Sequence, residues 1–439
     1  MAGYFEKMGI IIFTLDLHYI INKNLILSNW IEENMASTMR KYYAASFLGG
    51  LSFTNGILIL YYRNIGFSYS QIFLLSIVYE ILTFVLEIPS GILADLWSRK
   101  WVVVIGHALS GLSFLIVLIA PTFFPVFLLW SVLSAICTAL NSGTLTALIF
   151  DTLKENGEDQ QFYKVQSNIT ILTLLAQTIS IILGGWIADS WGFTYTLLFS
   201  AVSGLLQTAL FMTVQDTPSL YNPTNEENGH PKDNALGKFL RHFKRSLSFM
   251  TANKTFLVLS ILGVSGFVTI AVFNTTLQPL IATTGITSYL QVSIVIALFN
   301  LCSMVLIYLT RNKTDGFTKR QDLLFSLFLI AVLFLGIGLV HSTGMLFLLL
   351  LLNSLLEIYQ LIINNQMNHL IPSDTRATIL STQNQLNSLV YSLIAMLIGE
   401  SLDKFGLSRI NLIFAVCFAI LAFIFWMRMK RNDTKTIPN

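Results

Sequence analysis

The chain has 439 residues, of which 54% are hydrophobic and only 11% are charged, whereas soluble domains carry about a quarter charged residues. This balance excludes an ordinary soluble globular protein and indicates a lipid bilayer as the solvent. The formal net charge of +3 is too small at this length to favour a nucleic-acid partner. No Walker loop or catalytic triad with supporting context is present, so we do not expect an enzyme.

Residues 1–39 form the part of the chain that least resembles a membrane span. They mix an apolar stretch, residues 10–13, with charged residues such as Asp16 and Lys23. We interpret them as a peripheral N-terminal extension. The alternative is that translation starts at Met35 or Met39 and that this stretch is a start-codon artefact.

Twelve apolar segments follow, each near the length of about 20 residues that a spanning helix needs. They come in two sets of six, and we predict spans at 41–62, 68–94, 101–120, 123–150, 162–188, 193–214, 254–283, 288–310, 321–341, 344–370, 375–401 and 407–428. The pattern predicts an all-α membrane protein with two six-helix bundles, 40–214 and 251–430, and a short cytoplasmic tail, 431–439.

Residues 215–250 divide the two sets and are predicted to be a cytoplasmic linker. The first part is rich in proline and acidic residues. From Leu236 onwards, the apolar residues share one helical face, whereas Lys238, Arg241, Lys244 and Arg245 fall mostly elsewhere. This pattern favours an amphipathic helix that lies along an anionic membrane surface. A solvated basic linker is the alternative.

The distribution of basic residues indicates the orientation, because Lys and Arg near helix ends stay on the cytoplasmic side. If both termini are cytoplasmic, only Arg63, Lys404 and Arg409 of the 26 Lys and Arg residues fall on the outer side. None falls at the middle of a predicted span. We therefore expect a multi-pass protein of the cell membrane with both termini in the cytoplasm.

A short pattern, G-x3-D-x2 followed by a small residue, repeats at the ends of three predicted helices. It occurs at 91–98, 185–192 and 399–406. The starts of two helices repeat as well, since 68–71 and 288–291 both read as capping boxes. The repeats imply that each half consists of two inverted three-helix units and that the halves are related in parallel, an arrangement found in secondary transporters.

The first copy of the pattern, Gly91-Ile-Leu-Ala-Asp95-Leu-Trp-Ser-Arg99-Lys100, resembles the loop motif between helices two and three of the major facilitator superfamily. The resemblance covers about residues 40 to 430 and implies a secondary transporter that works by alternating access. It also implies that a proton gradient supplies the energy and that no cofactor is needed. We expect a monomer in the lipid bilayer, with a small-molecule substrate and protons as its partners.

The resemblance further implies a charge network that latches the outward-facing state. In this sequence its positions are occupied by Gly91, Asp95, Arg99, Lys100 and Asp151. A carboxylate near a helix N-terminus is favoured by the helix dipole, and the eleventh predicted helix begins just after residues 372–374. If the latch exists, neutralising Asp95 should shift the conformation more than the substrate affinity.

Two departures from the drug-antiporter members of that family matter. The fourth predicted helix lacks the mid-helix arginine of many proton-coupled antiporters, since residues 130–138 are uncharged. The fifth lacks the Gly-Pro that precedes the Gly-Gly pair in the antiporter signature. It keeps Ala176, Ser180, Gly184 and Gly185, which we predict to be close helix-packing positions. These departures weaken the assignment as a drug exporter and leave import open as an alternative.

Carboxylates inside predicted spans are the leading candidates for proton coupling. Glu80 and Glu357 fall near the middles of helices two and ten, and Glu87 follows seven residues after Glu80. A carboxylate there is costly unless it is paired, hydrated or protonated, so it marks a functional hypothesis by default. The alternative is a satisfied interhelical hydrogen bond. We predict Glu357 first and Glu80 second as coupling residues.

Glu357 leads because it belongs to a polar stripe at helical spacing with Asn353, Gln360 and Asn364, and such a stripe should face a wet cavity. The resemblance also assigns helices one, four, seven and ten to the central cavity. The predicted substrate-cavity residues are Asn55, Ser134, Thr138, Asn141, Asn274, Asn353, Glu357, Gln360 and Asn364. A roomy apolar cavity with one acid suits a lipophilic or cationic solute better than a sugar.

No metal site or disulfide is predicted, because Cys137, Cys302 and Cys417 lie in apolar segments without a CxxC pair or a nearby histidine. The favoured function is proton-coupled efflux of small amphipathic or drug-like compounds. A proton-coupled importer of a nutrient or metabolite is the alternative, because fold alone does not decide direction. A non-transporting membrane sensor or scaffold is the third hypothesis, with residues 215–250 as its interaction surface.

Overall fold

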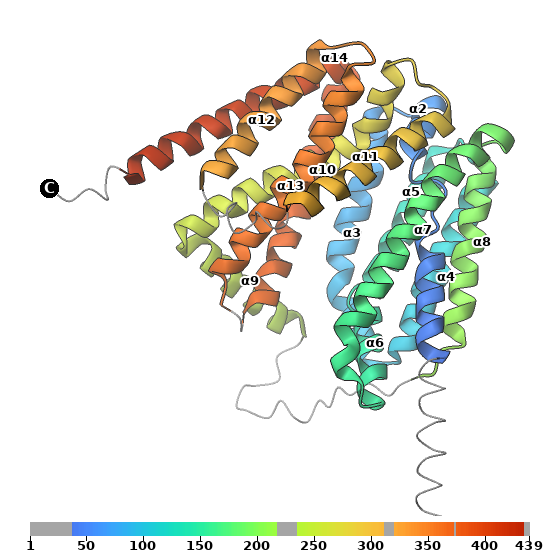
Figure 1. Ribbon diagram of the computed structural model, residues 1–439. Helices are drawn as coiled ribbons and strands as arrows, with labels where there is room; N and C mark the ends of the chain where they lie inside the picture. Colours follow the sequence, from blue (N-terminus) through green and yellow to red (C-terminus); the bar gives the residue numbers. More distant parts are fainter. Residues whose placement is uncertain (1–36, 217–234, 311–319, 373–374, 434–439) are drawn as a thin grey trace, which may run out of the picture.

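The computed structural model describes residues 37–216, 235–310, 320–372 and 375–433. The predicted N-terminal extension and the C-terminal tail lie almost wholly outside these ranges. Within the ranges, every regular element is a helix (Figure 1). The predicted all-α fold is therefore confirmed for the part of the chain that the structure describes.

The helices follow the predicted spans closely. Residues 37–50 are helical. The remaining helices of the first half are α2 (Leu58–Asn64), α3 (Tyr69–Leu96), α4 (Arg99–Ile119), α5 (Phe124–Asn141), α6 (Thr144–Glu155), the 3-10 turn η1 (Asp159–Gln161), α7 (Phe162–Trp191) and α8 (Phe193–Met212). Those after the linker are α9 (Ala235–Ala252), α10 (Lys254–Thr283), α11 (Tyr289–Thr310), α12 (Arg320–Leu339), α13 (Met345–Leu370) and α14 (Arg376–Asp433).

Ten segments of the described chain are long and apolar enough to cross a membrane. One of them, Thr378–Met427, contains two helices, because the backbone leaves the helical conformation at Gly406, where φ is 77°. Residues 37–50 together with α2 form one further span that is broken in the middle. The fold is thus two six-helix bundles with twelve spans, as the hydropathy pattern predicts.

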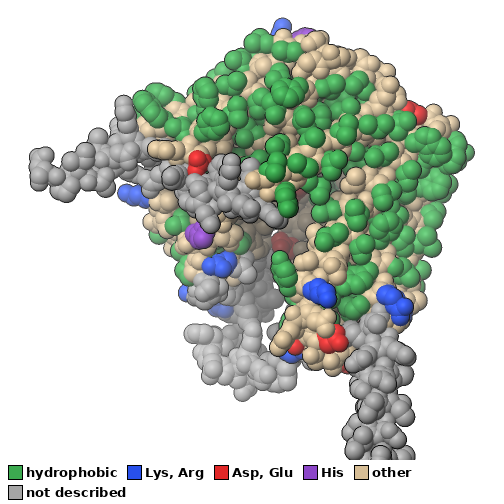
Figure 2. Space-filling model, in the orientation of Figure 1, with side chains coloured by type: hydrophobic (Ala, Val, Ile, Leu, Met, Phe, Trp, Pro, Cys, Tyr) green, Lys and Arg blue, Asp and Glu red, His purple; other side chains and the backbone are tan. Residues whose placement is uncertain are grey.

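The outer surface of the bundle is apolar. Side chains such as Leu301, Phe325 and Phe423 are more than half exposed, and hydrophobic side chains spread over much of the face shown in Figure 2. The interior contains the aromatic and aliphatic clusters around Tyr42 and Tyr359. A surface of this kind requires a bilayer as its solvent.

The two halves pack together through three pairs of helices: α2 with α10, α3 with α14, and α7 with α11. We call the end of the molecule that carries Asp189 and Asp403 the closed end, because several hydrogen bonds join the halves there. It lies at the top of Figure 1. Below this seal, Figure 2 shows the surface hollowed between the halves. The opposite end, which carries α6 and α9, is the open end.

The first span is not continuous, although the sequence predicts an unbroken helix over 41–62. Residues 51–57 leave the helical conformation, and backbone groups at membrane depth then need other partners. The side chain of Gln278 in α10, a residue only 5% exposed, is the partner of two backbone groups of this span. Its Nε2 donates to the carbonyl of Asn55 (3.1 Å), and its Oε1 accepts from the N–H of Leu60 (2.9 Å). The break is therefore held partly by the other half of the molecule.

The small residues of α7 allow the broken segment to lie close. Ser180 Oγ donates to the carbonyl of Ser52 (3.2 Å), and Ala176 faces Gly50. A Cβ atom at Gly184 would lie 1.9 Å from the backbone oxygen of Phe53. Gly185 faces the other half, where a Cβ atom would lie 2.5 Å from Ser293 Oγ of α11. The predicted packing positions thus contact both the first span and α11.

Replacing Gly184 by alanine should destabilise the protein, because the obstructing atom belongs to the backbone and cannot rotate away. Overpacking of this kind costs about 1–3 kcal/mol or more. We expect a clear drop in the melting temperature of the detergent-purified protein, measured by intrinsic fluorescence. Gly91→Ala is the matched control, because no atom lies within 4 Å of a Cβ atom at that position. Equal melting temperatures for the two variants would contradict the packing described.

The linker helix α9 forms, as the periodicity predicts, and packs against α10 and α14. Met250 is buried there, while Arg241, Lys244 and Arg245 are exposed. The side chains of residues 235–240 and 242 lie outside the described part of the chain. Whether the basic face lies on a membrane surface stays a prediction.

Candidate functional site

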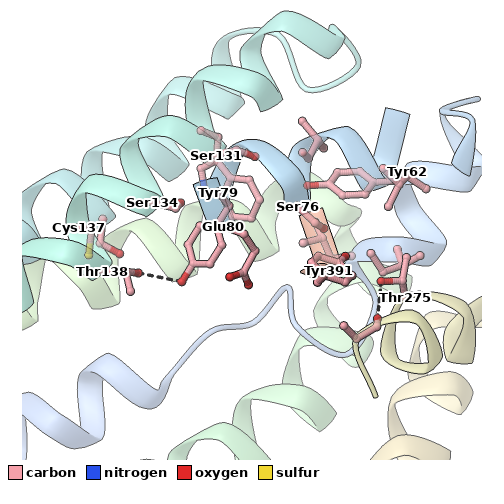
Figure 3. A pocket seen from close by; sticks show the side chains of 17 residues that line it. Tyr62, Ser76, Tyr79, Glu80, Ser131, Ser134, Cys137, Thr138, Thr275 and Tyr391 are labelled. Carbon is pink, nitrogen blue, oxygen red and sulfur yellow. Dashed lines mark hydrogen bonds between the residues drawn. The ribbon is translucent and has the colours of Figure 1, made fainter. Parts of the chain in front are cut away.

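A cavity of about 460 Å³ lies between the two halves. We call it the central cavity. Its walls come from α2, α3, α4 and α5 of the first half and from α10 and α14 of the second (Figure 3). The lining side chains that carry a polar group are Tyr62, Ser76, Tyr79, Glu80, Ser110, Trp130, Ser131, Ser134, Cys137, Thr138, Thr275 and Tyr391.

Glu80 is the acidic residue of this lining. It lies in the middle of α3, and Figure 3 shows its carboxylate directed into the space between Thr138 and Tyr391. No hydrogen bond or ion pair to this carboxylate is found among the described residues. An unpaired carboxylate at this depth is costly and therefore requires water, a proton or a bound cation.

The rest of the lining combines aromatic rings with hydroxyl groups. The hydroxyls of Tyr79 and Thr138 share a hydrogen bond of 3.0 Å. The buried Oη of Tyr62 and Nε1 of Trp130 lack a hydrogen-bond partner within the described chain. Since buried polar atoms are normally paired, these two groups of cavity-lining residues have hydrogen-bonding capacity that the described chain does not use. The cavity therefore offers one carboxylate, free hydrogen-bond donors and aromatic faces.

A second cavity, of about 400 Å³, adjoins Glu80 on the side of α14. We call it the α3–α14 pocket. Its lining residues are Glu80, Thr83, Phe84 and Glu87 of α3 and Leu380, Ser381, Asn384, Gln385 and Ser388 of α14. Gln385 Nε2 donates to Glu87 Oε2 at 3.0 Å. Glu80 lines both cavities and Glu87 only this one.

The asparagines and hydroxyls predicted on the cavity helices have different surroundings. Ser134 and Thr138 line the central cavity. Asn55 lies in the broken segment and accepts from Ser52 Oγ (3.0 Å). Asn141 donates to the carbonyl of Cys137 (3.0 Å) and faces Gly106 of α4. Asn274 is exposed and is not part of the central-cavity lining, although its neighbour Thr275 is.

The polar stripe of α13 mostly contacts neighbouring helices. Asn353 Nδ2 donates to Ser303 Oγ of α11 at 3.0 Å. Gln360 faces Gly266 of α10, and its Nε2 donates to Asn364 Oδ1 at 3.4 Å. Glu357 is exposed and belongs to the lining of neither cavity. The structure therefore brings Glu80, Ser134 and Thr138 together in one cavity and leaves Glu357 outside it.

The residues of the predicted latch lie at the open end. Arg99, at the start of α4, forms an ion pair with Asp151 of α6, and both side chains are largely buried. Lys100 lies over the ring of Trp101, with Nζ 5.1 Å from its centroid. Gly91 is exposed with free space around it, and the side chain of Asp95 lies outside the described residues. The contact of the latch with α14 stays a prediction.

Two carboxylates seal the closed end in the same way. Asp403, at the end of the first helix in α14, accepts from the N–H groups of Tyr69 (2.8 Å) and Ser70 (2.9 Å) at the start of α3. Asp189, at the end of α7, accepts from the N–H groups of Tyr289 (3.0 Å) and Leu290 (2.9 Å) at the start of α11.

Each of these carboxylates also accepts from a serine hydroxyl, Ser70 or Ser288. Each joins one half of the molecule to the other, and a carboxylate at a helix N-terminus is favoured by the helix dipole. We call these two contacts the aspartate clamps.

Sequence reasoning did not identify the aromatic lining of the central cavity or the aspartate clamps. No local pattern distinguishes Tyr62, Tyr79 or Tyr391 from the many aromatic residues of the chain. The clamps did leave a signal, because the repeated pattern contains Asp189 and Asp403 and the repeated helix starts contain Ser70 and Ser288. Pairing the two sets of repeats across the halves would have predicted them.

Comparison with known proteins agrees with this architecture. Residues 43–395 match the family model described as Major Facilitator Superfamily. An uncharacterised MFS-type transporter of Bacillus subtilis (strain 168), YxaM, is 23% identical over 421 residues, which cover 90% of this chain and 98% of that protein.

Solved transporters share the fold. A crystal structure of the nucleoside transporter NupG has a TM-score of 0.69 at 16% identity and covers 89% of this chain and 99% of that one. A bacterial homologue of the human lysosomal transporter Spinster, in an inward-facing and occupied conformation, has a TM-score of 0.68 at 15% identity, with coverages of 90% and 96%. Because the family model spans most of the chain, this protein belongs to the major facilitator superfamily of membrane transporters.

Proposed function

We propose that the protein exports small amphipathic compounds that carry a positive charge, in exchange for protons, by alternating access. The observation that carries the proposal is the unpaired carboxylate of Glu80 in a cavity lined by aromatic rings and hydroxyl groups. Aromatic faces attract organic cations, and a carboxylate adds a charge-assisted contact. The unpaired Tyr62 hydroxyl and Trp130 N–H would bind an acceptor group of the same compound.

The proposed orientation places the open end in the cytoplasm. It rests on the excess of Lys and Arg at that end, which includes Arg99, Lys100 and the exposed basic residues of α9. The conformation is then inward-open, with the aspartate clamps closing the outer side. A compound entering from the cytoplasm or the inner leaflet would reach Glu80 without crossing the seal.

In the proposed cycle, Glu80 carries either a proton or the cationic compound, but not both. A cation that binds at Glu80 displaces the proton towards the cytoplasm, and the halves then rock to expose the cavity outside. There a proton replaces the compound, and the protonated carboxyl group returns inward. Exchange follows because both ligands bind to the same carboxylate, so each binding event excludes the other.

Inverted membrane vesicles acidified inside test the proposal. Compounds from a panel of cationic, neutral and anionic amphipathic molecules are added outside, and an internal pH dye reports proton release. Cationic members should release protons in vesicles that contain the protein and not in vesicles without it. If no cationic member does so, the proposed export of organic cations is wrong.

Import of a nutrient or metabolite, proton-coupled as well, is the second candidate. The hydroxyl-rich lining favours it, because sugars and nucleosides need many hydrogen bonds. NupG, which has the same fold, is a nucleoside transporter. Right-side-out vesicles with an inward proton gradient distinguish the two. Accumulation of a labelled nucleoside or other metabolite without competition from organic cations would favour import.

A further inference from the structure

The α3–α14 pocket is more polar than a packing defect between two membrane helices should be. Two carboxylates, Glu80 and Glu87, line it from α3, and serine and amide groups line it from α14. Neither carboxylate forms an ion pair within the described chain. Negative charge that is not compensated at membrane depth requires water, a proton or a cation in the pocket.

Gln385 supplies an independent observation. Its side chain is more than nine-tenths buried, and its Nε2 donates to Glu87. A carboxylate only accepts hydrogen bonds, which fixes the orientation of the amide and directs Oε1 away from Glu87. This Oε1 atom has no donor among the described residues, and neither does the buried Oγ1 of Thr83 in the same lining. Oxygen atoms without donors in a pocket with two carboxylates are the ligand set of a small hard cation.

We infer that the α3–α14 pocket binds the coupling cation, a hydronium ion or a sodium ion, at Glu87 before it reaches the carboxylate of Glu80 that it shares with the substrate. This inference rests on the proposed function and names the route by which the ion reaches Glu80. Glu80 also lines the central cavity, so Glu87 is the carboxylate that belongs to this pocket alone.

The charged groups around the pocket agree with this assignment. Glu80 and Glu87 are the titratable residues of its described lining, and α14 contributes only uncharged residues to it. Tyr79 and Tyr391 lie on the central-cavity side of Glu80. On the other helices packed against α3, His107 of α4 and the basic residues Arg241, Lys244 and Arg245 of α9 are not part of the lining.

The location of the pocket explains how an ion bound there influences the conformation. α3 belongs to one half and α14 to the other, and the aspartate clamp at Asp403 joins their ends at the closed end. When the halves rock, the facing side chains of the two helices move relative to each other. An ion that contacts both Glu87 and Gln385 therefore binds the two conformations with different affinity, as coupling requires.

The test measures ion binding without any substrate. The full-length protein in detergent is titrated with sodium chloride against choline chloride at equal ionic strength, and separately from alkaline to acidic pH, with the melting temperature as readout. An ion that binds the native state raises this temperature. Glu87→Gln and Gln385→Leu should weaken the response to the ion by about tenfold in concentration. Glu155→Gln, at an exposed position of α6, should respond like wild type.

The outcomes distinguish sodium from protons, and they distinguish failure of this inference from failure of the proposed function. A sodium response lost in Glu87→Gln assigns sodium, and a pH response that shifts in this variant without a sodium response assigns the proton. If neither response changes in Glu87→Gln and Gln385→Leu while both variants remain folded, the inference is overturned. A response that only Glu80→Gln removes overturns it too, because the ion then binds in the central cavity. Failure of the vesicle assay with an intact ion response contradicts the proposed function alone.

Discussion

Replacing both Asp189 and Asp403 by asparagine is expected to weaken the seal at the closed end and populate a conformation in which the cavity opens at that end. Each carboxylate accepts from two backbone N–H groups and one serine hydroxyl at the start of a helix in the other half. Loss of an exposed charge at a helix N-terminus costs about 0.3–1 kcal/mol. The two clamps together therefore shift the equilibrium by a factor of about ten.

Distances between spin labels at Tyr195 and Lys404, exposed positions near the closed end, measure this shift. The double variant should gain a population with a longer distance, and each single variant should gain a smaller one. Glu400→Gln is the matched control, since Glu400 is an exposed acid of the same helix whose described contact is the 3.9 Å pair with Lys404. An unchanged distance distribution in the double variant would show that the clamps do not hold the seal.

Much of the fold follows from the sequence, because the bilayer imposes a simple rule on the chain. A segment that crosses the membrane must be apolar over its whole length. The predicted span 254–283 therefore coincides with α10, and the predicted span 193–214 differs from α8 by two residues. The capping box at Ser68 and Gln71 is confirmed as well, since Ser68 Oγ accepts from Gln71 N (3.1 Å) and Gln71 Oε1 accepts from Ser68 N (2.9 Å).

The broken first span could not be predicted in the same way. Hydropathy averages over a window of about 20 residues, so it does not register the polar residues and the Asn55-Gly56 pair that interrupt this span. The groups that stabilise the break lie more than 140 residues away in the sequence: Gln278 of α10, and Ser200 of α8, whose Oγ accepts from the N–H of Phe53 (3.1 Å). The Asn55-Gly56 pair weakens the helix locally, and these tertiary contacts bind backbone groups that the break leaves without helical partners.

The sequence also did not determine which of the intramembrane acids, Glu80 or Glu357, lines the central cavity. The spacing of Asn353, Glu357, Gln360 and Asn364 shows that these residues share a face of one helix, but not which neighbour that face meets. In the structure, Asn353 bonds to α11 and Gln360 faces α10. Glu80 belongs to a stripe of the same spacing on α3, with Ser76, Thr83 and Glu87, and this stripe is the one that faces the two cavities. The rotation of a helix is set by its packing, so only the folded chain reveals the cavity.

Glu80→Gln is expected to abolish proton-coupled transport and to weaken the binding of cationic compounds. Glutamine keeps the shape of the side chain and removes the charge that the compound and the proton share in the proposed cycle. A lost charge-assisted contact costs about 1.5–3 kcal/mol, which corresponds to about a tenfold to hundredfold loss of affinity. Tryptophan fluorescence is a suitable measure of binding because Trp130 lines the cavity, and the internal pH dye in vesicles measures coupling.

Glu357→Gln is the matched comparison, because it makes the same chemical change in another membrane helix. Glu357 is exposed and lines neither cavity, so this variant should keep both affinity and proton release close to wild type. The reverse result, with Glu357→Gln inactive and Glu80→Gln active, would show that Glu357 of α13 is the coupling residue, as the polar stripe in the sequence predicts. Because the two variants differ only in the helix that loses its charge, the pair of measurements separates a role of the central cavity from a general effect of an intramembrane acid.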